Sequence, residues 1–393
     1  MTNFTLYNDD CLNALKTMDD NSIDSCVTDP PYGLSFMGKA WDYDVPKKEI
    51  WEQVFRVLKP GGHLLAFFGS RTYHRGAIQI EDAGFEIRDQ IMWLYGSGFP
   101  KSHNIDKAID KEFGIERKVI GNHSGPGYTK TSVIQGAQKR NVTEWNIYDD
   151  KPVSDEAKQW DGWGTALKPA HEPIVVARKP VSEKSIAANV LKHGTGAINI
   201  DESRVPLASD DPLQNPITGR DNKSINTGVS DTSWGFKSVD REGGLGRFPA
   251  NIIHDGAIDI PEGKFFYCAK ASKSDRDEGL EQLLAKKIVT FQTGNGASGN
   301  ASSLSANRNT EYRNIHPTVK PTELMKYLVR LVTPKNGVVL DPFMGSGSTG
   351  KACGFEGFKF VGIEMSKEYF EIAKVRIDHA YKQKTATLED FFS

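Results

Sequence analysis

The chain has 393 residues, of which 38% are hydrophobic, and a formal net charge of −2 at pH 7. This length and apolar content suffice for one large domain with insertions or for two domains, and the near-neutral charge argues against a protein whose whole surface coats nucleic acid. We find neither a charged-then-apolar leader nor an apolar run near the roughly 20 residues that a membrane span requires, so we expect a cytoplasmic protein with no membrane partner.

Residues 1–96 alternate between strand-like and helix-like segments. The expected elements are a strand at 22–28, a helix from about Pro46 that closes at Lys59-Pro60-Gly61-Gly62, a strand at 63–68, a helix after Ser70 and a strand at 85–95. The first strand has the composition of a buried parallel strand, and two prolines stop it. Such alternation is typical of a layered α/β domain with a parallel sheet.

The middle of the chain, residues 97–311, is richer in Gly, Ser, Asn, Asp and Lys and has weak periodicity, which predicts insertions. A short apolar strand near 170–178 is expected to belong to the core sheet. Residues 294–309 are close to low complexity, which predicts a mobile loop or linker. Alternation resumes in residues 312–393. The elements expected there are a helix from about Thr322, a strand at 337–340, a helix to about Gly354, a strand at 358–363 and a last helix.

A glycine-rich turn follows the strand that ends at Asp341, and it reads Pro342-Phe343-Met344-Gly345-Ser346-Gly347-Ser348-Thr349-Gly350. Glycines let the backbone approach a ligand closely, and the next helix offers unpaired N–H groups, which favours a nucleotide-like ligand. Glu364 ends the next strand, where a carboxylate can accept hydrogen bonds from both ribose hydroxyls. The stretch from Gly345 to Lys351 also nearly matches an ATP-binding P-loop, but Ala352 lacks the hydroxyl that would bind magnesium.

The segment Asp29-Pro30-Pro31-Tyr32 follows the first expected strand and suits the methylation of an amino group. An exocyclic amine of adenine or cytosine is a poor nucleophile because its lone pair is delocalised into the ring. The carboxylate of Asp29 and the carbonyl of Pro30 can accept hydrogen bonds from the two amine protons and stabilise the positive charge that develops on nitrogen. The prolines keep the loop extended, and Tyr32 offers a flat surface for an extruded base.

These two segments resemble those of the amino-group DNA methyltransferases of the permuted beta class, in which the catalytic motif precedes the cofactor motif. Further matches are Tyr7-Asn8-Asp9-Asp10-Cys11, Leu58-Lys59-Pro60-Gly61-Gly62 and His316-Pro317-Thr318-Val319-Lys320-Pro321. The resemblance implies a Rossmann-like methyltransferase fold of the α/β class, with a mixed, mostly parallel sheet in permuted order. Its parts would be a catalytic half at 1–96, insertions with a target-recognition region at 97–311 and a cofactor-binding half at 312–393.

The resemblance also implies S-adenosylmethionine as the cofactor and assigns residues to it. Asp10, with Cys11 beside it, would bond to the adenine amino group of the cofactor and Glu364 to its ribose, Thr318 and Lys320 would approach its carboxylate, and the methionine end would be lined by Asp341, Pro342, Phe343, Gly345 and Gly347. Asp29, Pro30, Pro31 and Tyr32 would form the catalytic motif. Trp93 and Tyr95 fall near a family motif beside the flipped base, but the sequence after them departs from the usual pattern, so we expect buried core aromatics.

The implied reaction is direct in-line transfer to the N6 amino group of a flipped adenine in double-stranded DNA, and Asp rather than Ser at position 29 favours adenine over the N4 group of cytosine. Methylation of a ring carbon needs a cysteine after a proline, and none of Cys11, Cys26, Cys268 and Cys353 follows one; these scattered cysteines also predict no disulfide framework and no metal site. The resemblance further implies a homodimer, and it leaves open whether the enzyme, bacterial or phage-encoded, works with a cognate restriction endonuclease or as an orphan. The alternatives are an N4-cytosine methyltransferase, a noncatalytic DNA-binding regulator on the same scaffold, and a fused nuclease suggested by Glu156-Ala157-Lys158.

Overall fold

The computed structural model describes residues 3–34, 42–98, 102–129, 141–207, 211, 245–256, 265–287 and 311–392. They form two compact units, which are unit 1, residues 1–97 with 170–393, and unit 2, residues 98–169. The chain returns to unit 1 at residue 170, within the segment 97–311 that was predicted to hold insertions and a core strand near 170–178. The loop predicted to be mobile at 294–309 lies outside the described residues.

Among the described residues, nine strands of unit 1 form one sheet in the order β1-β13-β12-β2-β3-β7-β4-β8-β9. Their bounds are β1 Phe4–Tyr7, β2 Ile23–Thr28, β3 Leu58–Phe67, β4 Glu86–Leu94, β7 His171–Arg178, β8 Ile252–His254, β9 Phe266–Tyr267, β12 Val338–Asp341 and β13 Lys359–Ile363. Every neighbouring pair is parallel except the two that involve β7, which runs antiparallel to β3 and β4. The expected mixed, mostly parallel sheet in permuted order is confirmed, since β2 to β4 precede β12 and β13 in the chain.

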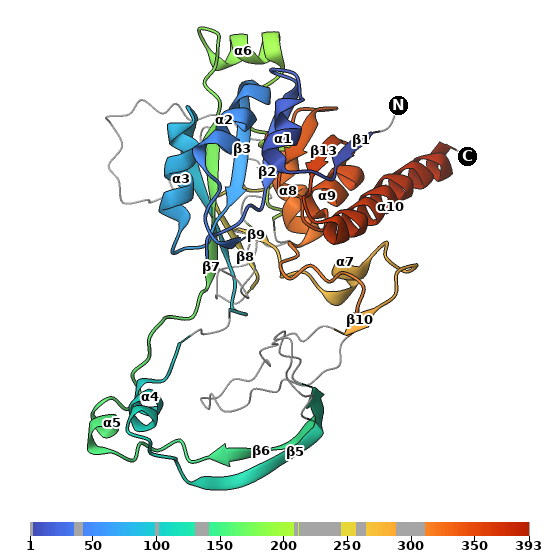
Figure 1. The fold of residues 1–393 in the computed structure, drawn as a ribbon. Coiled ribbons are helices and arrows are strands. Elements are labelled where there is room, and N and C mark those ends of the chain that lie inside the picture. The colour runs from blue at the N-terminus through green and yellow to red at the C-terminus, as the bar shows by residue number, and fades with distance from the viewer. Residues whose placement is uncertain are drawn as a thin grey trace. The chain divides into compact units, whose positions relative to one another are not determined.

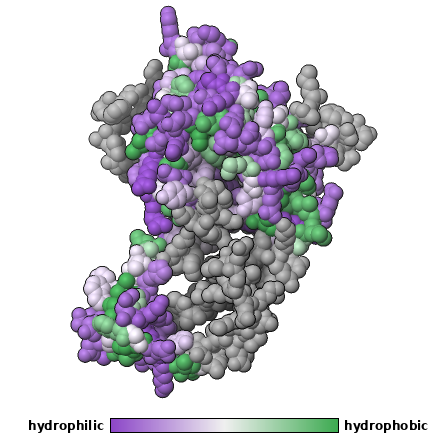
Figure 2. Space-filling view, viewed as in Figure 1, coloured by the Kyte–Doolittle hydropathy of each residue, from purple (hydrophilic) through white to green (hydrophobic). Residues whose placement is uncertain are grey.

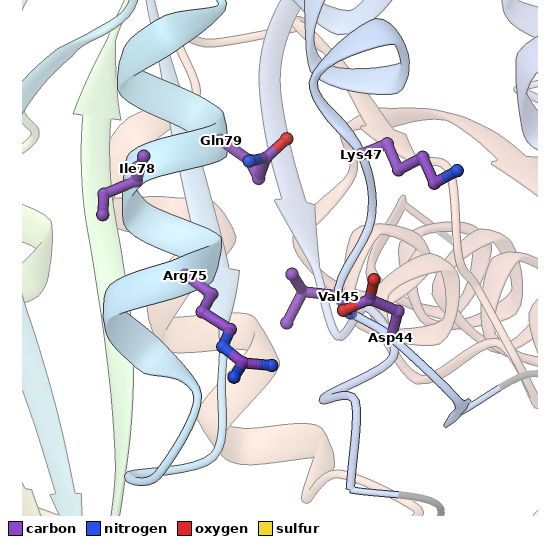
Figure 3. Close-up of a pocket in the computed structure, with 6 residues that line it drawn as sticks. All are labelled: Asp44, Val45, Lys47, Arg75, Ile78 and Gln79. Atoms are coloured by element: carbon purple, nitrogen blue, oxygen red, sulfur yellow. The ribbon is translucent and has the colours of Figure 1, made fainter.

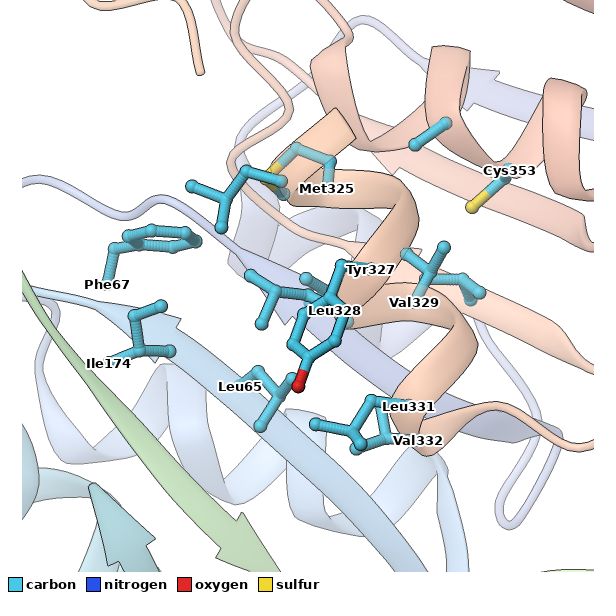
Figure 4. Packing of buried hydrophobic residues seen from close by; sticks show 14 of the residues in the cluster. Leu65, Phe67, Ile174, Met325, Tyr327, Leu328, Val329, Leu331, Val332 and Cys353 are labelled. Carbon is cyan, nitrogen blue, oxygen red and sulfur yellow. The ribbon is translucent and has the colours of Figure 1, made fainter. Parts of the chain in front are cut away.

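Helices cover both faces of this sheet (Figure 1). They are α1 Cys11–Lys16, α2 Lys48–Val57 and α3 Tyr73–Asp82 on one face, and α8 Thr322–Val332, α9 Ser348–Glu356 and α10 Lys367–Phe392 on the other. The alternation of side chains along β3 serves both layers. Leu65 and Phe67 pack in the cluster that contains α8 (Figure 4), whereas Leu64 and Ala66 pack in the cluster that contains α2 and α3.

Two sequence expectations differ from the structure. The helix expected to close at Lys59-Pro60-Gly61-Gly62 ends at Val57, and this segment belongs instead to β3. The reason is backbone pairing: Gly61 N donates to Lys179 O at 3.0 Å, and Lys179 N donates to Gly62 O at 2.9 Å. The short strands β8 and β9 extend the sheet from a region whose polar composition predicted only insertions.

The remaining elements are short. In unit 1 they are α6 Ile186–His193, a 3-10 turn at Asp201–Ser203, α7 Lys273–Asp277, and the antiparallel pair β10 Lys286–Lys287 and β11 Glu311–Tyr312. Every helix in the described ranges is too short or too polar to cross a bilayer. Hydrophilic side chains cover most of the described face of unit 1 in the space-filling view, with apolar ones interspersed (Figure 2).

Unit 2 contains α4 Ile105–Glu112, the antiparallel pair β5 Val119–Thr129 and β6 Asn141–Tyr148, and α5 Asp155–Gln159. A buried ion-pair cluster holds α4 in place, because Arg117 contacts Asp106 at 2.6 Å and Asp110 at 2.8 Å. The triplet that suggested a nuclease lies on α5, where Lys158 pairs with Asp155 on the surface. No group of three potential metal ligands is found in the described part of the chain.

Candidate active site

The topology brings four acidic residues to one edge of the sheet in unit 1. Asp10 follows β1, Glu364 follows β13, Asp341 ends β12, and Asp29 follows β2, and these four strands are adjacent and parallel. Parallel neighbours have their carboxyl ends at the same edge, which is where α/β sheets bind ligands. The two halves of the chain, more than three hundred positions apart, therefore meet at a single place.

Asp341 ties the glycine-rich turn to the strand that precedes the catalytic motif. One carboxylate oxygen accepts from Thr28 Oγ1 at 2.6 Å and from Phe343 N at 3.0 Å, and the other accepts from Thr349 Oγ1 at 2.5 Å. Burial raises the pKa of Asp341 to about 6 against these hydrogen bonds, and the charge of Asp29 adds to the rise. Asp341 thus fixes the geometry of the turn, since these three donors engage both of its carboxylate oxygens.

The turn after β12 has a backbone shape that requires glycine. Gly345 has φ +51° and Gly347 has φ +80°, both in the left-handed region. A Cβ on Gly345 would lie 2.8 Å from His316 Nε2, and one on Gly347 would lie 3.0 Å from Ala373 Cα. Pro342 is buried beside the turn and Phe343 is half-buried. The absence of side chains at these positions lets His316 and α10 pack directly against the turn.

Glu364 is held at the same turn by two backbone donors. Gly345 N donates to one carboxylate oxygen at 3.0 Å, and Ser366 N donates to the other at 2.7 Å. Burial raises the pKa of Glu364 to about 7, although both hydrogen bonds oppose this. The side chain is thus oriented by the turn that it borders.

Asp10 caps the helix that follows β1. Its Oδ1 accepts from Leu12 N at 2.9 Å and from Asn13 N at 3.2 Å, as an N-cap aspartate does. Cys11 is the first residue of this helix, and burial raises the pKa of its thiol to about 12. This cap fixes the Asp10 carboxylate on the loop after β1. The same loop lies beside Glu364, because Glu364 N donates to Tyr7 O at 3.0 Å.

Asp29 lies in a compact cluster with Tyr32, Lys320 and Glu172. Lys320 Nζ is 2.6 Å from Asp29 Oδ2 and 3.3 Å from Glu172 Oε2. The Tyr32 hydroxyl is 2.8 Å from Asp29 Oδ1 and 3.0 Å from Glu172 Oε2. Burial raises the pKa of Asp29 while the Lys320 ammonium opposes the rise, and for Lys320 the two carboxylates outweigh burial and raise its pKa.

The structure brings together residues that the sequence could only assign singly. Lys320, predicted to approach a cofactor carboxylate, contacts Asp29 here, and that cofactor role stays a prediction; Thr318, two positions earlier, is exposed. Trp93 and Tyr95 are buried core aromatics, as expected. Glu172 was missed, although it belongs to the predicted strand near 170–178. Because β7 runs opposite to its neighbours, its first residues lie at the edge where β3 and β4 end.

The chemistry of this edge fits S-adenosylmethionine. Asp10 and Glu364 provide acceptors for amino and hydroxyl donors, and the turn between β12 and α9 offers close backbone approach. An ATP-binding P-loop does not fit, because its lysine is engaged elsewhere. Lys351, the lysine of the P-loop-like string, is fully buried and pairs with Asp275 at 2.9 Å and Glu278 at 2.6 Å, so it is not available for phosphate.

A separate hollow on unit 1 contains none of the predicted site residues. It is lined by Asp44, Val45, Lys47, Arg75, Ile78 and Gln79, from α3 and the segment before α2 (Figure 3). One of its lining residues borders the catalytic loop, because Val45 N would lie 3.0 Å from a Cβ placed on Gly33, the residue after Tyr32.

Comparisons with known proteins identify the family of this chain. Residues 23–375 match the family model N6_N4_Mtase, described as DNA methylase. The Type II methyltransferase M.HindIII of Haemophilus influenzae is 22% identical over 415 residues, which cover 95% of this chain and 94% of that protein. The DNA adenine methyltransferase YhdJ of Escherichia coli is 43% identical over 70 residues, 18% of this chain and 24% of that protein. The solved PvuII DNA methyltransferase (cytosine-N4-specific) has a TM-score of 0.45 and 15% identity, over 98% of this chain and 93% of that one. Because the family model spans most of its length, the chain belongs to the N6/N4 DNA methylase family of S-adenosylmethionine-dependent methyltransferases.

Proposed function

We propose that this protein methylates the N6 amino group of adenine in double-stranded DNA, at a base flipped out of the helix. The observation that carries the proposal is the placement of Asp29 and Pro30 directly after β2, next to the glycine-rich turn after β12. Asp341 links the two segments through its hydrogen bond from Thr28. An amino group bound by the first segment would therefore stand beside a cofactor bound by the second.

The cofactor, when bound, supplies a methyl group on a positively charged sulfur. Asp10 and Glu364 would hold its nucleoside, and the backbone of Gly345 and Gly347 would border its methionine end. Asp341 would keep the glycine-rich turn in place. Thr318 and Lys320 would bind the carboxylate of the cofactor. The remaining residues that would line the site are Cys11, Pro342 and Phe343. These assignments rest on the shared edge of the sheet and on the family resemblance.

The chain's own groups prepare the amine for attack. Asp29 and the carbonyl of Pro30 would accept hydrogen bonds from the two amine protons, which directs the nitrogen lone pair out of the ring system. The positive charge that develops on nitrogen would be stabilised by Asp29, which then accepts a proton or passes it to solvent. Pro31 keeps the loop extended, and the ring of Tyr32 would stack on the base.

Adenine is favoured by the aspartate that opens the catalytic motif, and one local relative is named as an adenine methyltransferase. The experiment expresses the protein in a host that lacks DNA methylation and identifies the modified nucleosides by mass spectrometry. We expect N6-methyladenine. N4-methylcytosine would overturn the choice of base, and unmodified DNA would overturn the proposed activity in favour of a noncatalytic regulator. A homodimer and a partner endonuclease stay predictions.

Asp29→Ala tests the assigned catalytic group. We expect methylation to fall at least about a thousandfold, while the affinity for S-adenosylmethionine measured by calorimetry stays within about threefold of the wild type. The matched control is Asp82→Ala, which removes an exposed carboxylate at the end of α3, and it should methylate normally. Wild-type turnover in the Asp29 variant would refute its role.

A further inference from the structure

We infer that Glu172 is a positioning residue of the methyl-transfer site: it shares the Lys320 ammonium with Asp29 and leaves this cluster with one excess negative charge. The inference rests on the proposed role of Asp29. No sequence motif pointed to Glu172, and the geometry of β7 alone brings it to this position.

Glu172 reaches the site because it is the second residue of the antiparallel strand. Its neighbour Pro173 accepts through its carbonyl from Phe68 N at 3.0 Å, and Glu172 itself is in register with Trp93 on β4. The side chains of Asp29, Lys320 and Glu172 are only 8% to 19% exposed. Two strands and the segment before α8 thus meet in a largely dry space, where charges interact strongly.

Within the cluster, a single ammonium faces two carboxylates. The Tyr32 hydroxyl hydrogen-bonds to both of them, and the negative charge of Glu172 adds to the rise that burial causes in the pKa of Tyr95. Burial raises the pKa of both phenols, so they are neutral donors. The charge of the three central groups is therefore −1 when both carboxylates are ionised.

Other charged groups face this cluster from the surrounding elements. Lys270 lies over the Tyr95 ring at 3.6 Å and acts on Glu172 from the side of β9. Asp341 faces Asp29 from β12. His316, which precedes Lys320 in the chain, is neutral because burial and the nearby cations lower its pKa to about 3. Of the groups named here, only Asp29 and Glu172 place a carboxylate within 4 Å of the Lys320 ammonium.

This arrangement makes two opposite predictions for Asp29. The negative charge of Glu172 raises the pKa of Asp29, and the positive charge of Lys320 lowers it. Replacing Glu172 by an uncharged isostere should therefore lower the pKa of Asp29, whereas removing the ammonium should raise it. A purely structural role for Glu172 does not predict opposite displacements.

The excess negative charge also has a consequence for the rate. Positive charge develops on the amine during transfer, and a cluster with net charge −1 stabilises it better than a neutral cluster does. We expect Glu172→Gln to lower the plateau single-turnover rate about tenfold and to leave the affinity for S-adenosylmethionine within about threefold. The loss would fall on the chemical step.

The experiment measures single-turnover methylation of duplex DNA against pH in the wild type, Glu172→Gln, Lys320→Met and the surface control Glu52→Gln. The acid limb of the profile should move to lower pH in Glu172→Gln, to higher pH in Lys320→Met, and should stay in place in the control. Carbon-13 spectra of aspartate carboxyl groups, with the Asp29 signal identified by its loss in Asp29→Asn, measure the same pKa without cofactor or DNA.

Each outcome decides the inference. An unchanged or raised Asp29 pKa in Glu172→Gln, with a functioning wild type, overturns it and leaves the proposed function intact. A wild type that methylates no DNA overturns the proposed function instead, and the carbon-13 titration then still reports on the cluster. If Lys320→Met does not fold, the displacement in Glu172→Gln alone decides.

Discussion

Replacing Gly345 by alanine tests whether the glycine-rich turn is as closely fitted as the structure shows. The backbone there has φ +51°, and an added Cβ would lie 2.8 Å from His316 Nε2 and 3.1 Å from His316 Cε1. The imidazole ring has little room to yield, because it packs edge-on against Tyr369 with ring centroids 4.6 Å apart. The substitution therefore combines an unfavourable backbone conformation with a steric conflict.

The two contributions have different sizes. Holding a non-glycine residue in the left-handed region costs about 1–2 kcal/mol, and forcing an extra methyl group into a packed site costs about 1–3 kcal/mol. We expect Gly345→Ala to lower the free energy of unfolding by about 3 kcal/mol. Gly194 is the matched control in the same unit, since it has φ +76° and its Cβ would have no neighbour within 4 Å. Gly194→Ala should lose only about 1 kcal/mol.

Urea denaturation of both variants measures these losses, and calorimetry measures the affinity for S-adenosylmethionine. Gly345→Ala should also bind the cofactor at least about tenfold more weakly, because the turn shifts with His316, whereas Gly194→Ala should bind it normally. Equal losses of stability in the two variants would show that His316 yields freely. Normal cofactor binding by Gly345→Ala would show that this turn does not shape the cofactor site.

Two further predictions concern charged groups around the turn. The affinity for S-adenosylmethionine should fall about fivefold from pH 7 to pH 6, because Glu364, whose pKa is raised to about 7, binds ribose hydroxyls best when it is ionised. Calorimetry at the two pH values checks this prediction, and equal affinities would contradict it. Lys351→Met should lower the free energy of unfolding by about 2–3 kcal/mol, because the substitution leaves the carboxylates of Asp275 and Glu278 without their buried cation. Urea denaturation measures the loss. A variant as stable as the wild type would show that these ion pairs contribute nothing to stability.

Much of the fold could be predicted because hydrophobic periodicity marks the long elements clearly. The strand at 22–28, the helix from Thr322 and the strand at 337–340 match β2, α8 and β12 within a residue or two. The segment from Lys59 to Gly62 was misassigned because Pro and Gly are common helix ends, and the pairing with Lys179 that decides otherwise is a tertiary contact. The strands β8 and β9 are too short for periodicity to reveal them.

The candidate site shows the same division between local and long-range information. Motif chemistry alone singled out Asp29 and Glu364, because each stands at the end of a predicted strand. Glu172 could not be found that way, since its place at the site depends on the direction of β7, and strand direction leaves no mark in the local sequence. The partners of Lys351 were likewise hidden, because Asp275 lies 76 positions away.

The reversed strand has a consequence for how this protein can change over generations. Tyr95 N, just after β4, donates to Ala170 O, just before β7, at 2.9 Å. Residues 96–169 thus leave and re-enter the sheet at two positions that a backbone hydrogen bond joins. Doubling the length of a flexible loop within this segment costs only about 0.6 kcal/mol of closure entropy. Related proteins can therefore carry a longer or different segment at this position while the sheet and its ligand-binding edge stay unchanged.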